Sequence, residues 1–334
     1  MENKITRKRL SDFLSYEWIV MIIIAVVAIF GLEIIYDVTS VQLTAGQSFK
    51  YYYDTSIASV SNNELVNQLI ERKTFSYDVI KLNTESLDPE NNVLTSRLSI
   101  QEGDVIFTDI NGIDKTETYN EVEYPAYVRA KGHVDSTSYV MYALDDMLAD
   151  AKNYLTKNFI KDGQEISIAN IDDQKVEKVF RKRMKGDNRF RKESQIKKGI
   201  VAERLRIEKL IENVIYFDAF INNPQYQNAL FKYRRYEQVY NRSTTDESKE
   251  LYGSWLAEQE EKIFGINIGV LDEMGNGVDA TKILQLKSPE NKEDKLSKNV
   301  VLMAFDFKSY QPHLQYESLS FVCSTIQMLL GETV

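Results

Sequence analysis

The stretch FSYDVIKLNTESLDPENNVLTSRLSIQEGDVIFTD, residues 75–109, contains the pattern that decides the fold class. Residues 77–82 and 104–108 are rich in apolar side chains, and each predicts a short strand. Between them, Asp88 and Pro89 predict the start of a helix, because Asp caps free backbone N–H groups and Pro suits the first turn. Two strands joined by a helix within about 32 residues predict a crossover unit with parallel strands.

The residues before this stretch extend the same pattern. Residues 38–43, VTSVQL, predict a strand that leaves the preceding apolar segment. Residues 62–72 predict a helix that places Leu65 and Leu69 on one face. The resulting order of strand, helix, strand, helix and strand predicts half of an open α/β sheet.

The remainder of the chain alternates helical patterns with two apolar strands. The longest helical pattern ends at Asn222, Asn223 and Pro224, which are helix-stopping residues. We expect helices over residues 139–159, 194–221, 225–238, 254–264 and 316–330, and strands over residues 266–271 and 300–307.

Residues 18–36, WIVMIIIAVVAIFGLEIIY, form a long apolar segment. At about 1.5 Å of rise per residue, a helix of this length approaches the roughly 30 Å hydrocarbon core of a bilayer. Glu33 falls near one end, and Trp18 and Tyr36 bracket the segment as interfacial aromatic residues do. A cleaved signal peptide is the alternative, but bulky residues follow where a small-x-small cleavage site would stand. We therefore expect an uncleaved transmembrane anchor.

The flanking charges predict the orientation of this anchor. Lys4, Arg7, Lys8 and Arg9 precede the apolar segment, whereas the first basic residue after it is Lys50. Basic flanks stay on the cytoplasmic side of a membrane. We expect a single-pass protein of the cell membrane with a cytoplasmic N-terminus and an extracellular C-terminal domain.

Composition excludes several classes of function. The formal net charge of −9 argues against a nucleic-acid partner. Cys323 is the only cysteine and His133 and His313 are the only histidines, so common zinc sites and His-assisted nucleophiles have few residues to use. The run GNGVDA at residues 275–280 lacks the helix and crossover of a dinucleotide loop. We expect no metal, no cofactor and no enzymatic activity.

One class of enzyme stays open as an alternative. The 50 Asp and Glu residues offer many carboxylate pairs, so an anchored cell-wall hydrolase that uses such a pair is retained as a hypothesis.

Residues 175–209 form a basic segment in an otherwise acidic chain. The segment contains fourteen Lys or Arg against five Asp or Glu, a local charge of +9. It is read either as the solvated face of a long helix or as a patch that faces anionic lipid, cell-wall polyanions or an acidic partner. The residues that would form this patch are Arg181, Lys182, Arg183, Lys185, Arg189, Arg191 and Lys192.

Several of these pieces resemble a known family. Residues 38–108, which include the run GDVI at 103–106, are similar to the start of the first lobe of a type 2 extracellular solute-binding protein of ABC sugar importers. The helix over 139–159 and the runs FGINIGVL (264–271) and VVLMAFDF (300–307) resemble later parts of such proteins. The chain departs from the family by having a protein anchor in place of a lipid on cysteine, and charged helices in its middle.

The resemblance implies an extracellular α/β domain like a solute-binding protein. With the departures included, we expect an α/β fold in which one N-terminal transmembrane helix precedes this domain and helices are added to it. The expected divisions are a cytoplasmic tail (1–17), the transmembrane helix (18–36), a first α/β lobe (37–160), a helical basic region (161–262) and a second α/β part with a closing helix (263–334).

The same resemblance implies a function. We expect an accessory subunit of an ABC-type importer that docks on permease subunits, with an oligosaccharide as a candidate ligand. A sensing domain that works with a separate signalling membrane protein is the alternative. Candidate ligand contacts, which follow expected strands or stand in loops, are Asp54, Asn83, Asp109 and Trp255.

Overall fold

The computed structural model divides the chain into two units, residues 1–45 and 46–334. It describes residues 11, 18–39, 47–54, 63–77, 79, 81–87, 103–109, 117–119, 122–124, 141–277, 300–306 and 316–332.

The first unit contains helix α2, Trp18–Thr39, which has 22 residues. Its side chains are described at Trp18, residues 22–30 and Leu32, and all of these are exposed. Among the residues with described side chains, no helix combines the length and the apolar character needed to cross a membrane. The strand expected over residues 38–43 is wrong at its start, where α2 continues through Thr39, and residues 40–43 lie outside the described residues.

The second unit is built on a mixed sheet of seven strands in the order β2-β1-β3-β9-β8-β7, with β6 pairing to β9. Strands β2, β1 and β3 are parallel, whereas β9, β8, β7 and β6 join through antiparallel pairs. The strands are β1 (Ser48–Asp54), β2 (Lys81–Leu87), β3 (Val105–Asp109), β6 (Met141–Tyr142), β7 (Leu230–Tyr233), β8 (Lys262–Asn267) and β9 (Val300–Phe305). A separate hairpin pairs β4 (Glu117–Tyr119) with β5 (Val122–Tyr124).

The parallel part of the sheet confirms the predicted α/β fold. Helix α3, Asn63–Glu71, connects β1 to the parallel strand β2, and its buried Leu65 and Leu69 face the core as the sequence pattern predicts. Strand β2 begins four residues later than the expected strand over 77–82, because residues 73–77 form a turn whose polar groups bond to helix α14 (Glu317–Leu330). The helix expected from Asp88 lies outside the described residues.

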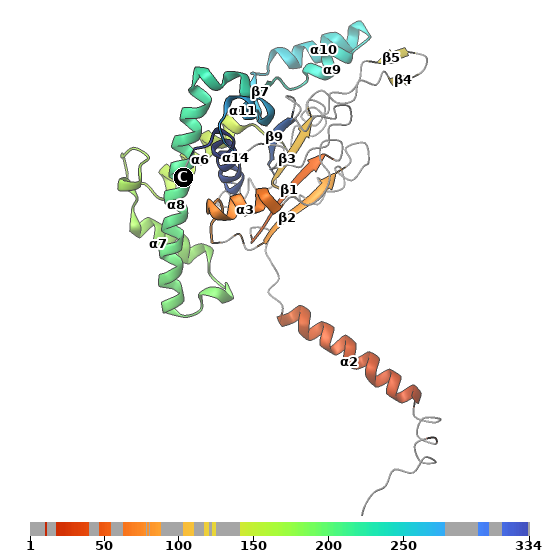
Figure 1. Cartoon of the computed structure of the whole chain (residues 1–334), viewed down its shortest axis with the longest axis vertical. Coiled ribbons are helices and arrows are strands. Elements are labelled where there is room, and N and C mark those ends of the chain that lie inside the picture. Colours follow the sequence, from red (N-terminus) through yellow and green to blue (C-terminus); the bar gives the residue numbers. More distant parts are fainter. Residues whose placement is uncertain are drawn as a thin grey trace, which may run out of the picture. The chain divides into compact units, whose positions relative to one another are not determined.

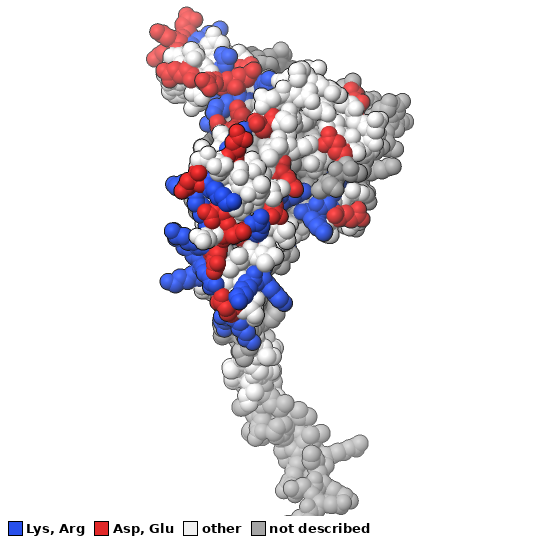
Figure 2. Space-filling view, turned by 90° about the vertical axis from the view of Figure 1, so that its left-hand side faces the viewer, with Lys and Arg blue, Asp and Glu red and all other residues white. Residues whose placement is uncertain are grey.

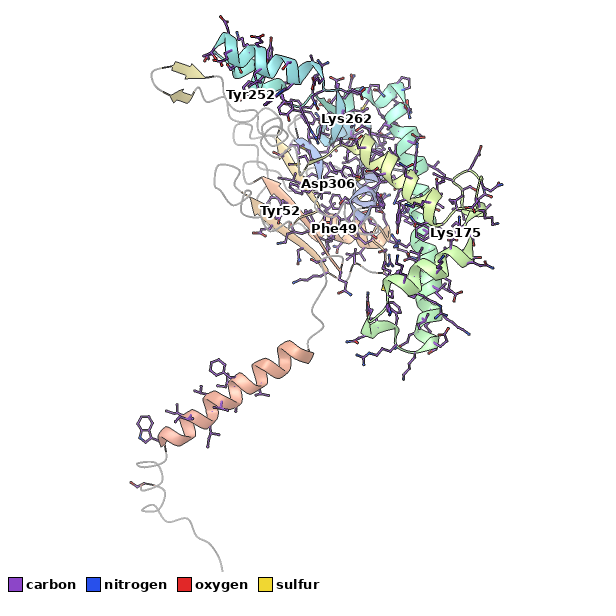
Figure 3. All side chains as sticks on the ribbon, turned by 180° about the vertical axis from the view of Figure 1, so that it is seen from behind. Phe49, Tyr52, Lys175, Tyr252, Lys262 and Asp306 are labelled. Atoms are coloured by element: carbon purple, nitrogen blue, oxygen red, sulfur yellow. The ribbon has the colours of Figure 1, made fainter. Side chains whose placement is uncertain are left out.

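Helices α3, α6 (Leu144–Asn158) and α14 cover one face of the sheet, and α8 (Glu193–Asn222) packs on α6 and α14 (Figure 1). Alternate residues of β9 divide between two apolar clusters: Leu302 belongs to the larger cluster, which includes these helices, and Met303 to the smaller one. On β1, Phe49 and Tyr52 make the same division, and both are labelled in Figure 3. The helices are α6 (Leu144–Asn158), α8 (Glu193–Asn222), α11 (Ile268–Met274) and α14 (Glu317–Leu330).

Helix α14 is buried along nearly its whole length, which explains its run of apolar and small residues. The ring of Phe321 stacks on Phe49 of β1 with 5.3 Å between centroids. Gly331, with φ +72°, ends the helix in the left-handed conformation that glycine adopts without strain. The helices expected over 194–221 and 316–330 and the strand expected over 300–307 are confirmed to within two residues at each end.

The remaining helices lie outside this layer. Helix α7 (Asp173–Arg183) packs beside α8, and the short helix η3 (Asn188–Phe190) connects the two. Helices α9 (Glu237–Arg242) and α10 (Asp246–Ala257) pack together at the other end of the unit (Figure 1). Two further 3-10 helices are η2 (Ile168–Asn170) and η4 (Pro224–Ala229).

Three sequence expectations in this region are wrong. The helix expected over 225–238 is instead η4, the strand β7 and the start of α9, because Leu230, Phe231 and Tyr233 are buried in the sheet. The helix expected over 254–264 ends at Ala257, and β8 begins at Lys262. The strand expected over 266–271 becomes α11 from Ile268, because the side chain of Asn267 caps a helix by accepting a hydrogen bond from Val270 N.

The sheet takes strands from both of the α/β parts expected at 37–160 and 263–334. Strand β3 of the first part pairs with β9 of the second, with Phe107 opposite Leu302.

Candidate functional site

A cavity of about 400 Å³ opens between the turn after α3, the middle of α8 and the start of α14. Its lining is mostly apolar, with charged groups among the apolar ones. Lining residues include residues 73–77, Leu205, Arg206, Lys209, Tyr316 and Glu317.

The turn of residues 73–77 forms one wall, and polar side chains fix it to α14. The buried Thr74 Oγ1 donates a hydrogen bond to Ser324 Oγ at 2.9 Å. The backbone N–H of Ser76 donates to Glu317 Oε2 at 3.3 Å. The two bonds join residues that are 250 and 241 positions apart in the sequence, so the wall exists only in the folded protein.

A buried ionic cluster lies behind the cavity. Arg206 donates to Glu203 twice, from Nη2 to Oε1 at 2.8 Å and from Nε to Oε2 at 3.0 Å. Arg183 Nη2 donates to Glu203 Oε2 at 2.7 Å, and the hydroxyl of Tyr77 donates to the same oxygen at 3.1 Å. The Glu203 side chain is fully buried, so two guanidinium groups and a phenol supply the hydrogen bonds that water would give an exposed carboxylate.

The pKa of Glu203 follows from these partners. Burial by itself raises the pKa of a carboxyl group, but the charge and hydrogen bonds of Arg206, followed by those of Arg183 and Tyr77, outweigh it and lower the pKa to about 2. For Arg206, burial would lower the pKa, yet the charge of Glu203 raises it above its usual value. Both groups are therefore ionised throughout the physiological pH range.

The cavity is suited to binding more than to acid–base chemistry. Burial raises the pKa of Tyr316, so its phenol stays protonated at neutral pH and offers a neutral donor and acceptor. The ionised groups Glu203 and Arg206 are held in a fixed pair, with no proton to give or take near neutral pH. A mostly apolar hollow with a few converging polar groups is the usual form of a small-molecule or peptide site.

The structure does not bring the four predicted ligand residues together. Asp54 and Asp109 are the last residues of the strands β1 and β3, which lie side by side, although their side chains are outside the described ones. Asn83 is in β2, where its Nδ2 donates to Ser48 Oγ at 3.0 Å. Trp255 is in α10, against Tyr236 and Tyr252 (Tyr252 is labelled in Figure 3). None of the four lines the cavity.

The predicted basic patch divides into inward and outward residues. Arg183 points inward to Glu203, Arg181 pairs with Glu177 and Glu193, and Arg189 pairs with Asp187. The remaining four, Lys182, Lys185, Arg191 and Lys192, are exposed. Figure 2 shows Lys and Arg side chains gathered on the lower part of the helical face.

The cavity was not predicted from the sequence, although the sequence contains a signal for the charged cluster beside it. Glu203 and Arg206 stand on the same helical face as the buried residues Ile207 and Leu210, where charged residues are unusual unless they are paired. The spacing of three residues also suits an ion pair on one helix. No comparable signal connects Phe75 or Tyr77 to α8, because that contact depends on long-range packing.

Comparison with known proteins identifies no relative: no family model, no curated protein and no solved structure matches this chain. Within the described residues, no group of three or more His, Cys, Asp or Glu side chains is placed to hold a metal ion.

Proposed function

We propose that this protein is a single-pass, membrane-anchored binding protein without enzymatic activity, and that it serves as an accessory subunit of an ABC-type sugar importer. The cavity beside α8 is the single observation that supports binding most directly. Its volume of about 400 Å³ falls within the range of small-molecule sites. Its buried charges are locked in pairs, which favours recognition over proton transfer.

The proposed anchor is α2. Its 22 residues contain the apolar segment 18–36, and Lys4, Arg7, Lys8 and Arg9 precede it, as expected for a helix that keeps its N-terminus in the cytoplasm. The unit 46–334 is then held outside the cell.

The link to an importer rests on the resemblance of residues 38–108 to solute-binding proteins, and two features of the sheet support it. Strands β2, β1 and β3 are parallel. The chain passes from β1 to β2 on one side and then to β3 on the other side of β1. Open α/β sheets bind ligands at such a switch point, outside the carboxyl ends of the strands. Asp54 and Asp109 stand at those ends, so this edge is a second place where a solute could contact the protein.

Purification of the intact protein from membranes in mild detergent tests the proposal. We expect permease and ATPase subunits of an importer to copurify. A Leu205→Arg variant, which places a charge in the mouth of the cavity, is expected to lose this association if the partner inserts there, whereas Leu251→Arg on α10 is a matched control outside the cavity. Recovery of the wild-type chain without any transporter subunit would overturn the importer assignment.

Calorimetry of the detergent-solubilised chain with oligosaccharides tests for a solute. If Leu205→Arg abolishes the heat of binding, the sugar binds in the cavity. If the heat of binding is unchanged in this variant, the edge of the sheet with Asp54 and Asp109 is favoured. Release of sugar fragments from cell-wall glycans by the purified chain would overturn the non-enzymatic assignment.

A sensing role is the second candidate, and the course of α8 favours it. This one helix of 30 residues lines the cavity with Leu205 and Arg206 and also carries Lys197 and Lys198 at its basic start. Occupancy of the cavity could therefore shift a surface at the far end of the same helix. Copurification of a kinase in place of permease subunits would support this role.

A further inference from the structure

One end of the unit 46–334 carries exposed cations, none of which forms a salt bridge with a carboxylate in the described part of the chain. We call this surface the basic end. It consists of exposed residues on α7, on the first turns of α8 and in the connection between these helices: Lys178, Lys182, Lys185, Arg191, Lys192, Lys197 and Lys198.

The acidic residues of the same segment are already occupied. Glu177 and Glu193 both pair with Arg181, with distances of 2.7 Å in each case. Asp187 pairs with Arg189 at 2.8 Å. Glu193 also attracts Lys197, one turn along the same helix. No other Asp or Glu occurs between residues 175 and 198, so the basic end keeps an excess of positive charge at its surface.

Packing holds these cations in place. The ring of Phe190 meets Phe180 edge-on at 5.0 Å and Tyr77 at 6.2 Å between centroids. The carboxylate of Asp187 accepts a hydrogen bond from Arg189 N at 2.8 Å and so caps η3. The connection between α7 and α8 is therefore attached to the body of the unit, and the charges around it form a defined surface.

Apolar side chains continue this surface along α8. Lys197, Val201 and Leu205 follow one another at intervals of four residues and so lie on one face of the helix. Val201 is 62% exposed and Leu205 is 60% exposed. A soluble polyanion would gain nothing from exposed Val and Leu, whereas a bilayer interface accepts apolar side chains beside lysines.

The basic end is also the end at which the chain enters the unit. Figure 1 shows the beginning of β1 and the connection between α7 and α8 at the same end. Only residues 40–47 separate α2 from β1, and eight residues span at most about 28 Å when fully extended. If α2 is the anchor, this end of the unit is tethered near the bilayer.

We propose that the basic end docks on an anionic phospholipid bilayer, with the seven cations facing lipid phosphates and Val201 entering the headgroup layer. The inference rests on the proposed anchor. Docking would fix the orientation of the tethered unit and would weaken as salt screens the charges.

The test uses the full chain in lipid nanodiscs, with a donor dye on Ser194→Cys and an acceptor dye on lipid headgroups. Cys323 is buried, so the dye reacts at the exposed position 194. We expect energy transfer to rise about twofold when phosphatidylglycerol replaces part of the phosphatidylcholine, and to return to the neutral-lipid value at high salt.

Two triple variants make the test specific. Lys182→Glu/Lys185→Glu/Lys192→Glu is expected to abolish the dependence on lipid charge. Lys157→Glu/Lys161→Glu/Lys249→Glu changes the net charge equally at exposed positions outside the basic end and is expected to retain it. Circular dichroism of each variant verifies that it is folded.

Other outcomes would overturn the inference. Equal energy transfer in neutral and anionic nanodiscs would exclude docking on lipid. If the energy transfer responds to added soluble polyphosphate and not to lipid charge, the basic end binds a soluble polyanion instead. A chain that stays in solution after lysis without detergent would remove the anchor instead. Flotation of that soluble chain with neutral and anionic vesicles would then decide whether the basic end binds lipid.

Discussion

The ring of Phe180 occupies the space that a side chain at Gly199 would need: a Cβ built on Gly199 would lie 2.2 Å from Phe180 Cζ. Glycine normally weakens a helix interior by about 1 kcal/mol relative to alanine. Its presence in the second turn of α8 is explained by the close contact between α7 and α8.

Gly199→Ala is accordingly expected to destabilise the protein by roughly 1–3 kcal/mol, because the overlap with Phe180 and Phe190 outweighs the gain in helix propensity. Urea unfolding followed by circular dichroism measures the change. Gly253→Ala on α10 is the matched control, since its Cβ would meet only the ring of Tyr240, at 3.2 Å. Equal or greater stability of Gly199→Ala would contradict the packing of α7 on α8.

The ionic cluster gives the second prediction. Glu203→Ala removes the carboxylate to which the buried Arg206 donates two hydrogen bonds, and the loss of one member of such a buried pair costs about 3–5 kcal/mol. Glu208→Ala removes a partner of Arg204 in a more exposed pair and is expected to cost below about 1 kcal/mol. Similar urea midpoints for the two variants would show that the cluster contributes no more than a surface pair.

The fold could be predicted from the sequence where the apolar periodicity is strong. The prediction was wrong where tertiary contacts decide whether a segment forms a helix or a strand. Helix α8 and strand β9 have long, consistent apolar patterns, and their bounds are close to the expected ones. Residues 230–233 were expected to be helical, yet they form β7 because β8 offers an antiparallel partner with Leu230 opposite Ile266. Tyr236, with φ +67°, then interrupts any continuous helix.

Strand β1 was missed for a similar reason. Its sequence, SFKYYYD, has little alternation, because Tyr51 and Tyr52 are buried on opposite faces of the sheet. Alternation identifies strands with one exposed face, so a strand buried on both faces escapes it.

The candidate site was less accessible to prediction than the fold. The paired charges Glu203 and Arg206 could be recognised from their place among buried residues of α8. Their partners Tyr77 and Arg183 are distant in sequence from each other, so only the folded chain shows that they meet at Glu203.

The third prediction concerns the single cysteine. Cys323 is fully buried on α14, and burial raises the pKa of its thiol, so the reactive thiolate is scarce at neutral pH. We expect a maleimide to leave Cys323 unmodified in the native protein and to modify it fully in urea, with mass spectrometry as the readout. The exposed Ser194→Cys thiol is the positive control, and rapid labelling of native Cys323 would contradict the burial of α14.

The last prediction concerns acid stability. The pKa of Glu203 is about 2 in the folded protein against its usual value of 4.5, because Arg206 and Arg183 outweigh the effect of burial. A carboxyl group with a lowered pKa stabilises the folded state above its unfolded pKa, and this stabilisation disappears as the pH falls from about 4.5 towards about 2. The wild-type protein should therefore lose unfolding free energy across this interval.

Glu203→Gln cannot titrate, so its stability should be lower than that of the wild type at neutral pH and should fall less steeply in the same acid interval. Glu208→Gln, which alters the more exposed pair with Arg204, should keep the wild-type slope. Urea unfolding at a series of pH values from 6 down to about 2 measures both slopes. Parallel curves for the wild type and Glu203→Gln would mean that Glu203 is not held ionised by the two arginines, and the cavity beside it would lose its fixed charges.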